Sequence, residues 1–352
     1  MSDKRFRWGY VGTGGIVRRN WEAARLSGNG RVAAVASRDL QKARDFISER
    51  QTAFPFDQEP VAFGSYEELI ASPEIDAVYV GLPTGLRKKW VILAAQAGKH
   101  VLGEKPCAST FTDLEEMIAA CREKHVLFMD GVMFMHSARL PKLREVLDDG
   151  ESVGRLRRVS SAFSFNGSPE FLATNIRTDS TLEPAGALGD LGWYNIRLAL
   201  WAAKGELPVR VSGQILEEVT REGSAEAVPI SFSGEMEFAG GLSSSFYCSF
   251  TSGRQQWARF DGEKGTVMMD DFVLPAETAG PVGFFSGSSR IEVDEVWSND
   301  PTWQAAKLFR NFADLARSGQ DFEPWADIAL KTQRVVEALV ESAREGRAVE
   351  LL

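Results

Sequence analysis

Two patterns of hydrophobic and polar positions divide this chain of 352 residues. In the first 130 residues, short apolar runs alternate with stretches of helical periodicity; the runs are Phe6–Val11, Arg31–Ala36, Ala77–Val80, His100–Gly103 and Val126–Met129. Such runs are typical of buried parallel strands that are joined by crossover helices. This part of the chain therefore predicts a doubly wound parallel α/β sheet.

The helices expected between these strands have recognisable ends. They cover Gly15–Leu26, Asp39–Arg50, Tyr66–Ala71, Leu86–Ala97 and Thr112–Lys124. Asp39 and Ser65 stand where N-terminal caps are expected, and Gly98 stands where a helix should stop.

The second part of the chain predicts an α+β domain. Apolar residues alternate with Ser, Arg or Glu in six expected strands, Arg157–Phe165, Val209–Leu216, Ile230–Phe238, Leu242–Phe250, Gln256–Phe260 and Thr266–Asp270. This alternation is typical of an open, mostly antiparallel sheet with one covered face. The expected helices are Gly186–Ala203, Trp303–Arg317 and Asp327–Arg344, with a hairpin turn at Gly240-Gly241 and a surface loop over Pro275–Ser289.

We therefore expect two domains, a dinucleotide-binding domain over residues 1–130 and a substrate-binding domain over residues 131–352. The hydrophobic fraction of 44% and the charged fraction of 25% are those of a globular protein, and the net charge of −9 argues against nucleic-acid or anionic membrane partners. Cys107, Cys121 and Cys248 have no CxxC spacing and are expected to be free thiols. Without a visible signal peptide or long apolar run, a cytoplasmic location is expected.

A glycine-rich loop follows the first expected strand. We expect a pyrophosphate to contact Gly12, Thr13, Gly14, Gly15 and Ile16, because glycines admit a close backbone approach and a helix N-terminus stabilises negative charge. The third position of this fingerprint, normally Gly or Ala, is Val17.

The end of the second strand indicates which dinucleotide is bound. NAD-selective folds usually carry an acidic residue there, whereas this chain has Ser37 and Arg38, which suit a 2′-phosphate. We expect NADP, with NAD as the alternative if Asp39 reaches the ribose instead of capping a helix. Arg38 as a solvated surface charge is the other alternative.

Two later strand ends supply further candidates. Pro83 and Thr84 follow one strand, and Glu104, Lys105 and Pro106 follow the next. Lys105 beside a proline is held more firmly than a surface lysine, and an oxidised nicotinamide nearby would lower its pKa towards a catalytic range.

A third group lies in the helical insertion. Asp190, Tyr194 and Arg197 are spaced so that a helix would align them on one face. With Trp193 beside them, they form a plausible polyol pocket, although Tyr194 could also pack in the core. His136 either lines the pocket or is packed, and no His, Cys or Asp spacing matches a metal site.

These motifs together resemble the Gfo/Idh/MocA oxidoreductases. The resemblance rests on the early glycine loop, Ala36-Ser-Arg-Asp39, Glu104-Lys-Pro106 and Asp190-x-Gly-x-Tyr194, and it covers nearly the whole chain. It implies a Rossmann domain followed by an open-sheet domain that often forms a dimer interface, so a homodimer or a dimer of dimers is expected. It also implies hydride transfer between NAD(P) and a hydroxyl-bearing carbon of a sugar-like ring.

The resemblance also implies roles for particular residues. Lys105 would match the family lysine at substrate and nicotinamide, and Tyr194 stands where inositol dehydrogenases have histidine and where aldose-oxidising and dihydrodiol branches have tyrosine. Arg87 replaces a common histidine and Arg197 replaces a common aspartate. These arginines suggest an anionic or strongly polar substrate, or for Arg87 only a contact with the cofactor phosphates.

The resulting hypothesis is NADP-dependent oxidation of an aldopyranose at C1 to a lactone. Tyr194 and Lys105 act as the acid/base pair, and Asp190 holds a hydroxyl or orients that pair. The alternatives are reduction of a keto or anhydro sugar, dihydrodiol oxidation, redox-assisted glycoside cleavage and a catalytically silent NADP-binding regulator.

Overall fold

The computed structural model describes residues 5–275, 281–320 and 322–351, which form two compact units. The first unit contains the described residues up to Ala108, together with Thr112–Ser137 and Ser298–Ala329. The second contains Ser109–Phe111, Ala138–Trp297 and the chain from Leu330 on. This division differs from the expected one, because residues 131–137 and 298–329 group with the first unit and residues 109–111 with the second.

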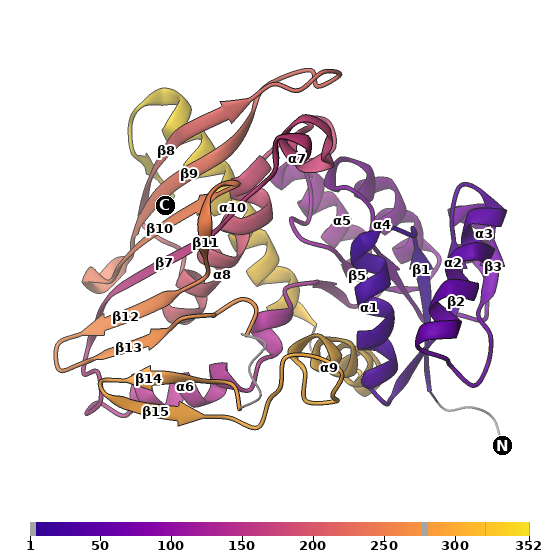
Figure 1. Ribbon diagram of the computed structural model, residues 1–352, viewed down its shortest axis with the longest axis horizontal. Helices are drawn as coiled ribbons and strands as arrows, with labels where there is room; N and C mark the ends of the chain where they lie inside the picture. Colours follow the sequence, from indigo (N-terminus) through magenta and orange to yellow (C-terminus); the bar gives the residue numbers. More distant parts are fainter. Residues whose placement is uncertain (1–4, 276–280, 321, 352) are drawn as a thin grey trace. The chain divides into compact units, whose positions relative to one another are not determined.

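The first unit is a parallel sheet with helices (Figure 1). Its strands are β1 (Phe6–Val11), β2 (Gly30–Ala36), β3 (Val61–Phe63), β4 (Ala77–Val80), β5 (His100–Gly103) and β6 (Phe128–Asp130). Its helical segments are α1 (Gly15–Leu26), α2 (Leu40–Ala53), α3 (Tyr66–Ala71), η1 (Thr84–Leu86), α4 (Arg87–Gln96), α5 (Phe111–Glu123), η2 (Met133–His136) and α9 (Gln304–Ser318). The strand order β3-β2-β1-β4-β5-β6 confirms the doubly wound fold.

Helix α9 joins the first unit because its apolar face completes that unit's core. Phe309 and Phe312, one helical turn apart, pack on Trp8 of β1 with ring centroids 5.0 and 4.8 Å away. Phe309 also lies 5.7 Å from the ring of Tyr79 in β4. Burial of such aromatic rings is a large stabilising contribution, and it accounts for the grouping of residues 298–329 with the sheet.

The second unit has a ten-stranded sheet and a set of helices (Figure 1). Its strands are β7 (Leu156–Asn166), β8 (Arg210–Val219), β9 (Val228–Glu237), β10 (Ser243–Ser249), β11 (Thr251–Gln255), β12 (Ala258–Gly262), β13 (Thr266–Met269), β14 (Gly283–Ser286), β15 (Ser289–Glu292) and β16 (Val349–Glu350). Its helical segments are α6 (Arg139–Asp148), α7 (Pro169–Thr174), η3 (Ile176–Thr178), η4 (Leu188–Gly192), α8 (Trp193–Ala202) and η5 (Ala239–Gly241), together with α10 (Glu323–Glu345) from Leu330 on.

This sheet is mostly antiparallel, as expected, although β7 and β10 at its centre run parallel. One face is covered by helices, and glycines permit their close approach. A Cβ on Gly213 of β8 would lie 2.3 Å from the carbonyl oxygen of Leu339 in α10. Gly234 of β9, which pairs with Gly213, would place a Cβ 3.1 Å from the Leu339 side chain, so both glycines leave room for this leucine. No described helix is long and apolar enough to cross a membrane.

The expected surface loop over Pro275–Ser289 is wrong in its second half. Gly283–Ser286 forms β14 and Ser289 begins β15, while residues 276–280 lie outside the described part of the chain. Phe284 is 2% exposed, and the hairpin turns at Gly287 with φ +56°. β14 is formed by backbone pairing and one buried aromatic side chain, Phe284. Its glycine and serine content resembles that of a loop, which is why the sequence did not predict this strand. The short strand β3 and helix α6 were also not predicted.

Val17 of α1 can pack closely against the sheet because a glycine lies opposite its side chain. Val17 is fully buried, and a Cβ on Gly81, at the end of β4, would lie 2.4 Å from Val17 Cγ2. The close packing that a Gly or Ala at the third fingerprint position normally allows is therefore obtained from the strand side.

Replacing Gly81 by alanine should lower the free energy of unfolding by about 1–3 kcal/mol, because the added methyl overpacks Val17. Adding Val17→Ala should relieve part of this cost, giving a coupling of roughly 1 kcal/mol in a double-mutant cycle. Urea denaturation measures both. Gly253→Ala is the control, since a Cβ there meets nothing within 4 Å. Purely additive costs would contradict this account of Val17.

Candidate functional site

The residues expected to hold a cofactor lie at one edge of the first unit's sheet. The loops after β1, β2, β4 and β5 all leave the carboxyl ends of parallel strands. They carry Gly12–Ile16, Ser37 and Arg38, Pro83 and Thr84, and Glu104 and Lys105. The crevice beyond such strand ends is where doubly wound sheets bind ligands.

The glycine loop has the backbone that a dinucleotide fingerprint needs. Gly12 has φ +104°, a conformation that side-chain-bearing residues rarely adopt. Gly14 is the N-cap of α1 and no side chain caps this helix, so its first N–H groups face outwards. A Cβ on Gly15 would meet nothing within 4 Å, and Ile16 is 42% exposed. This open, uncapped helix N-terminus fits a pyrophosphate.

The end of β2 resolves the role of Asp39. Its Oδ1 accepts hydrogen bonds from the backbone N–H groups of Gln41 (2.8 Å) and Lys42 (3.3 Å), so it caps α2. Ser37 is buried, whereas Arg38 is exposed at the same edge. The polar groups beside the expected ribose position are therefore a hydroxyl and a guanidinium.

A carboxylate is buried beneath the expected catalytic lysine. Glu104 is 6% exposed, and its Oε1 accepts hydrogen bonds from the Tyr79 hydroxyl (2.6 Å) and from Asn20 Nδ2 (3.1 Å). Asn20 Nδ2 also donates to the Tyr79 hydroxyl at 2.7 Å. Burial and the neighbouring carboxylate raise the pKa of Tyr79 well above its usual range, so the phenol stays protonated and donates.

Lys105 is half-buried, and its backbone N–H donates to Glu104 Oε2 at 3.3 Å. Thr84 and Arg87 surround the same loop, since both donate to the carbonyl oxygen of Pro106. Arg87 is 3% exposed and its other hydrogen bonds go to Leu82 and Glu104 carbonyls. The structure therefore gives Arg87 main-chain partners, where the sequence suggested a substrate or a phosphate.

His136 belongs to the packed interior of the first unit. Its ring is stacked on Trp325 at 4.9 Å with an interplanar angle of 7°, and its Nδ1 lies 3.0 Å from Asn311 Nδ2. It is 7% exposed. Of the two roles open to it, the packed one agrees with these contacts.

In the second unit, Asp190 is paired with an arginine that the sequence did not indicate. Arg177 Nε donates to Asp190 Oδ2 at 2.8 Å, and the side chains are 39% and 14% exposed, respectively. The Asp190 carboxylate is the main cause that raises the pKa of Arg177; burial opposes it, and Glu183 and Tyr194 add smaller contributions. Tyr194 is 6% exposed and packs edge-on against Phe163 at 5.5 Å. Asp190 and Arg177 thus form an ion pair in the unit that also contains Tyr194.

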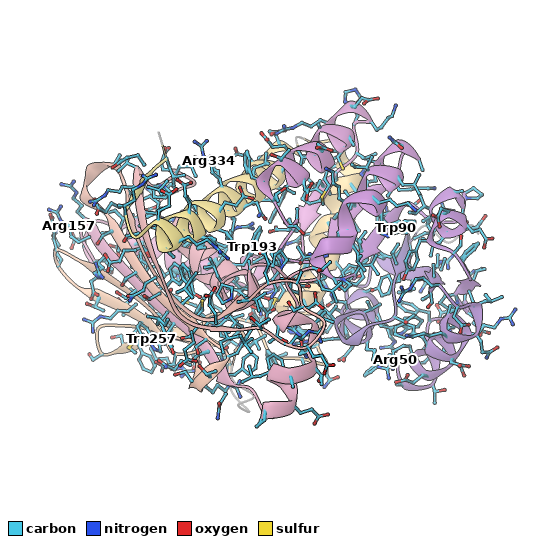
Figure 2. All side chains as sticks on the ribbon, turned by 90° about the horizontal axis from the view of Figure 1, so that it is seen from above. Arg50, Trp90, Arg157, Trp193, Trp257 and Arg334 are labelled. Carbon is cyan, nitrogen blue, oxygen red and sulfur yellow. The ribbon has the colours of Figure 1, made fainter. Side chains whose placement is uncertain are left out.

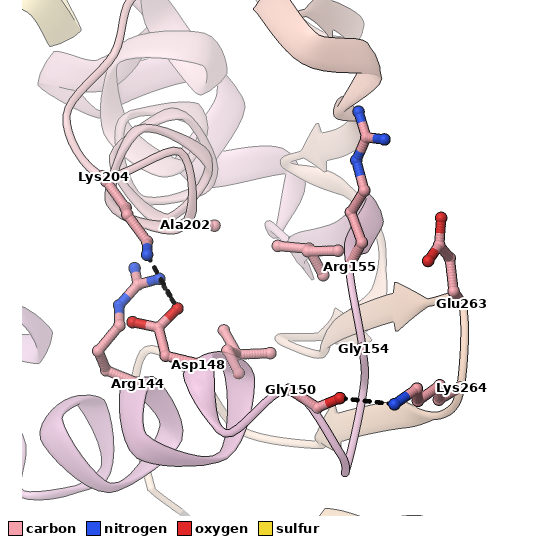
Figure 3. A pocket seen from close by; sticks show the side chains of 11 residues that line it. Arg144, Asp148, Gly150, Gly154, Arg155, Ala202, Lys204, Glu263 and Lys264 are labelled. Atoms are coloured by element: carbon pink, nitrogen blue, oxygen red, sulfur yellow. Dashed lines mark hydrogen bonds and ion pairs between the residues drawn. The ribbon is translucent and has the colours of Figure 1, made fainter.

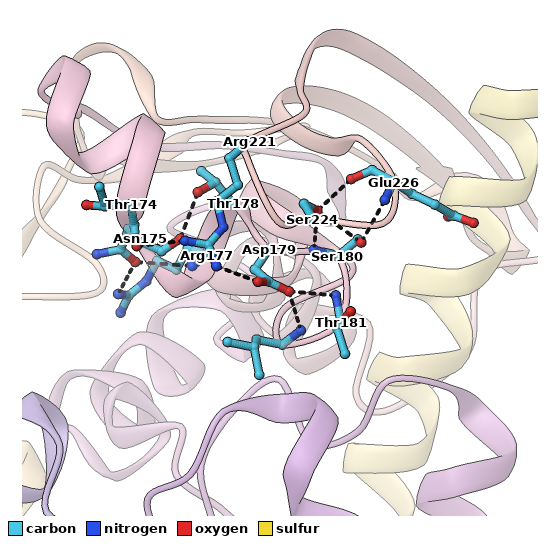
Figure 4. Close-up of polar contacts among 11 residues, drawn as sticks. Thr174, Asn175, Arg177, Thr178, Asp179, Ser180, Thr181, Arg221, Ser224 and Glu226 are labelled. Carbon is cyan, nitrogen blue, oxygen red and sulfur yellow. Dashed lines mark hydrogen bonds and ion pairs between the residues drawn. The ribbon is translucent and has the colours of Figure 1, made fainter.

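Arg177 is held by a polar cluster around η3 (Figure 4). The Asn175 side chain accepts from the backbone N–H of Arg177 at 3.1 Å. Asp179 accepts hydrogen bonds from Thr181 N (2.9 Å) and from the Arg221 side chain. The bond to Arg221 anchors the loop after β8 and holds the pKa of Asp179 below its usual value. The sequence did not indicate that Arg177 pairs with Asp190, because the two residues are 13 positions apart and do not have a helical spacing.

The expected alignment of Asp190, Tyr194 and Arg197 on one helical face is interrupted. Leu188–Gly192 is π-helical and α8 begins only at Trp193, which changes the angular spacing; π-turns occur frequently at functional sites. Arg197 has no exposed surface and donates to Thr332 Oγ1 at 2.8 Å. Trp193 is equally buried and lies inside the second unit (Figure 2). Their burial argues against direct contact with a substrate.

Comparison with known proteins identifies the family. Residues 6–132 match the family model described as an oxidoreductase family with an NAD-binding Rossmann fold, and residues 141–268 match the GFO/IDH/MocA C-terminal domain. The chain belongs to the Gfo/Idh/MocA oxidoreductases. The enzyme is therefore a nicotinamide-dependent oxidoreductase, as the resemblance implied.

Three relatives of this Gfo/Idh/MocA chain span nearly its whole length. The dTDP-3,4-didehydro-2,6-dideoxy-alpha-D-glucose 3-reductase of Saccharopolyspora spinosa is 34% identical, over 90% of this chain and 89% of its own. The D-xylose 1-dehydrogenase (NADP(+)) 2 of Haloferax volcanii is 29% identical over 98% and 99%. The solved 3-ketoreductase of Actinomadura kijaniata with NADP and TDP-benzene is 26% identical, with a TM-score of 0.79 over 96% and 98%.

A cavity elsewhere in the Gfo/Idh/MocA C-terminal unit does not carry this chemistry. Its volume is about 540 Å³, and Arg144, Asp148, Lys204 and Lys264 line it (Figure 3). Lys204 pairs with Asp148 at 3.0 Å and Lys264 donates to the Gly150 carbonyl at 2.9 Å. None of the residues expected to act on substrate or cofactor is in its lining.

Replacing Tyr79 by phenylalanine tests the buried carboxylate. The substitution removes one donor from Glu104 and should lower the free energy of unfolding by about 1–3 kcal/mol, since a buried acceptor loses a partner. Thermal or urea denaturation measures the change. Tyr66→Phe is the control, because none of the hydrogen bonds described within residues 5–275 uses its hydroxyl. Equal stability of the two variants would contradict a supporting role for Tyr79.

Proposed function

We propose that this enzyme transfers hydride between NADP and a ring carbon of a sugar-like substrate, with Tyr194 and Lys105 as the acid/base pair. The observation that carries the proposal is the Asp190–Arg177 ion pair in the unit that contains Tyr194, in an enzyme whose first unit presents Lys105 at the ligand-binding edge. When bound, the nicotinamide ring supplies or accepts the hydride.

The residues of the first unit bind and orient. The N–H groups at the start of α1 would hold the pyrophosphate, and Arg38 with Ser37 would hold the 2′-phosphate. Lys105, at the end of β5, holds the reacting oxygen of the substrate and shares in the proton transfer. Arg87 and Asp39, which are occupied by main-chain groups, do not take part in binding.

The residues of the second unit move the proton. In the oxidative direction Tyr194 takes the proton of the substrate hydroxyl as the carbon loses its hydride and the C=O bond forms. Asp190 fixes the position of the Arg177 guanidinium, which supplies a positive charge in the same unit as Tyr194. Arg177 also gives an anionic substrate a partly exposed partner, a role for which the sequence had suggested Arg87 and Arg197.

The first candidate reaction is oxidation of an aldopyranose at C1 to a lactone. It is supported by the similarity to the NADP-dependent D-xylose 1-dehydrogenase over almost the full length of both chains.

The second candidate is reduction of a keto sugar, and the 34% identical 3-reductase supports it. The A. kijaniata 3-ketoreductase has been solved as variants with a tyrosine replaced by phenylalanine and with a lysine replaced by alanine. These are the two residue types that we assign as the acid/base pair.

A substrate panel should separate the two reactions. We expect either NADP+ reduction with one aldose, with release of a lactone, or NADPH oxidation with a keto sugar. The absorbance of the reduced nicotinamide measures both reactions. Lys105→Ala and Tyr194→Phe should each lower kcat/KM by about 10²–10⁴-fold, the usual contribution of a positioned acid or base. Tyr247→Phe in β10 is the matched control and should retain activity. Near-normal turnover by Tyr194→Phe would overturn its assignment.

Replacing Arg38 by alanine tests the cofactor preference. The loss of a charged hydrogen bond to the 2′-phosphate should raise KM for NADP+ roughly 10–100-fold, with KM for NAD+ changed by less than about threefold. Steady-state kinetics with both cofactors provide the ratio. Arg44→Ala, an exposed arginine in α2, controls for general charge effects. A parallel rise in both KM values would argue against phosphate recognition by Arg38.

A further inference from the structure

Arg87 is the first residue of α4, and its guanidinium is buried against main-chain carbonyls of the first unit. Nε donates to Leu82 O at 2.7 Å, in the loop after β4. Nη1 donates to Glu104 O at 2.6 Å and also to Pro106 O, in the loop after β5. One side chain therefore bonds to the loops that follow two neighbouring strands.

These hydrogen bonds bracket Lys105. The carbonyl of Glu104 belongs to the peptide group that precedes Lys105, and the carbonyl of Pro106 lies just beyond it. Both oxygens accept from the same nitrogen of Arg87. Thr84 Oγ1 adds a second donor to Pro106 O at 3.3 Å, and Glu104 Oε2 accepts from the Lys105 N–H. The backbone on both sides of Lys105 is thereby fixed.

Burying a guanidinium is costly, and arginine is suited to this arrangement where lysine is not. The cation is 3% exposed, so it has lost most of its hydration. Its planar group presents several donors in fixed directions, while an ammonium is a compact charge on a flexible stem. Charged donors also form the stronger hydrogen bonds.

We propose that Arg87 is a positioning residue for Lys105, which it holds in the geometry required for proton transfer. This inference rests on the proposed function, in which Lys105 contacts the reacting oxygen. Misplacement of a catalytic group by about 1 Å can reduce turnover about 10²-fold. Arg87 acts through Lys105 and does not itself touch the substrate.

A double-mutant cycle on kcat tests the inference in the intact enzyme with NADP(H). Arg87→Ala should lower kcat by roughly 10–100-fold when Lys105 is present, but by less than about threefold in the Lys105→Ala background, because residues that act as a unit are not additive. Slow variants are followed under single-turnover conditions. Added guanidinium ion should restore part of the kcat of Arg87→Ala.

Arg139→Ala is the matched control. Arg139 is also fully buried and donates to the carbonyls of Asp271 (3.1 Å) and Phe272 (3.3 Å), but it also pairs with the Asp271 carboxylate at 2.8 Å and belongs to the second unit. Its replacement should change kcat by the same factor in both Lys105 backgrounds. If Arg87→Ala does not fold, Arg87→Lys replaces it, and full kcat in Arg87→Lys would overturn the inference.

The outcomes distinguish the inference from the proposed function. A normal kcat for Lys105→Ala would reject the role of Lys105 and with it the positioning role. A large loss for Lys105→Ala together with an equal cost of Arg87→Ala in both backgrounds would reject only the positioning role. A smaller cost in the Lys105→Ala background, with guanidinium rescue, would support both.

Discussion

Glu104 places a carboxylate inside the first unit, and the geometry of the functional edge depends on how that carboxylate is paired. Its donors come from α1 through Asn20, from β4 through Tyr79 and from the next residue along the chain. A buried carboxylate is tolerated only when its oxygens accept hydrogen bonds. The requirement therefore fixes the fingerprint helix, the neighbouring strand and the loop that carries Lys105 relative to one another within this unit.

The Asp190 pair performs a related task in the second unit, in a wetter environment. Arg177 and Asp190 are partly exposed, so their attraction is screened by solvent and contributes less to stability than a buried pair would. The pair instead fixes the position of the Arg177 guanidinium in the unit that contains Tyr194. The bond between Asp179 and Arg221 ties η3 to the loop after β8 and so helps to keep Arg177 in this position.

Much of the fold could be predicted from sequence because periodicity is a local property. Apolar runs predicted the parallel strands, and the alternation of apolar and polar residues predicted the antiparallel sheet. Asp39 and Ser65 cap α2 and α3 as expected. The missed features depend on distant partners. Val17 is explained by Gly81, Arg177 by Asp190, and β14 by backbone pairing with β13 and β15. Arg87 drew attention as an unusual residue, but only the positions of three carbonyl groups reveal its contacts.

The position of α9 also has a consequence for biosynthesis. Trp8, Tyr10 and Tyr79 are near the start of the chain, whereas Phe309, which packs on all three rings, is near its end. During synthesis these aromatic rings stay without their α9 partner until residues 138–297 have been made. Apolar surface that is exposed in this way makes nascent chains prone to aggregate or to bind chaperones. The nucleotide-binding unit is thus begun first but completed only after most of the second unit has been made, and it is not a separable N-terminal module.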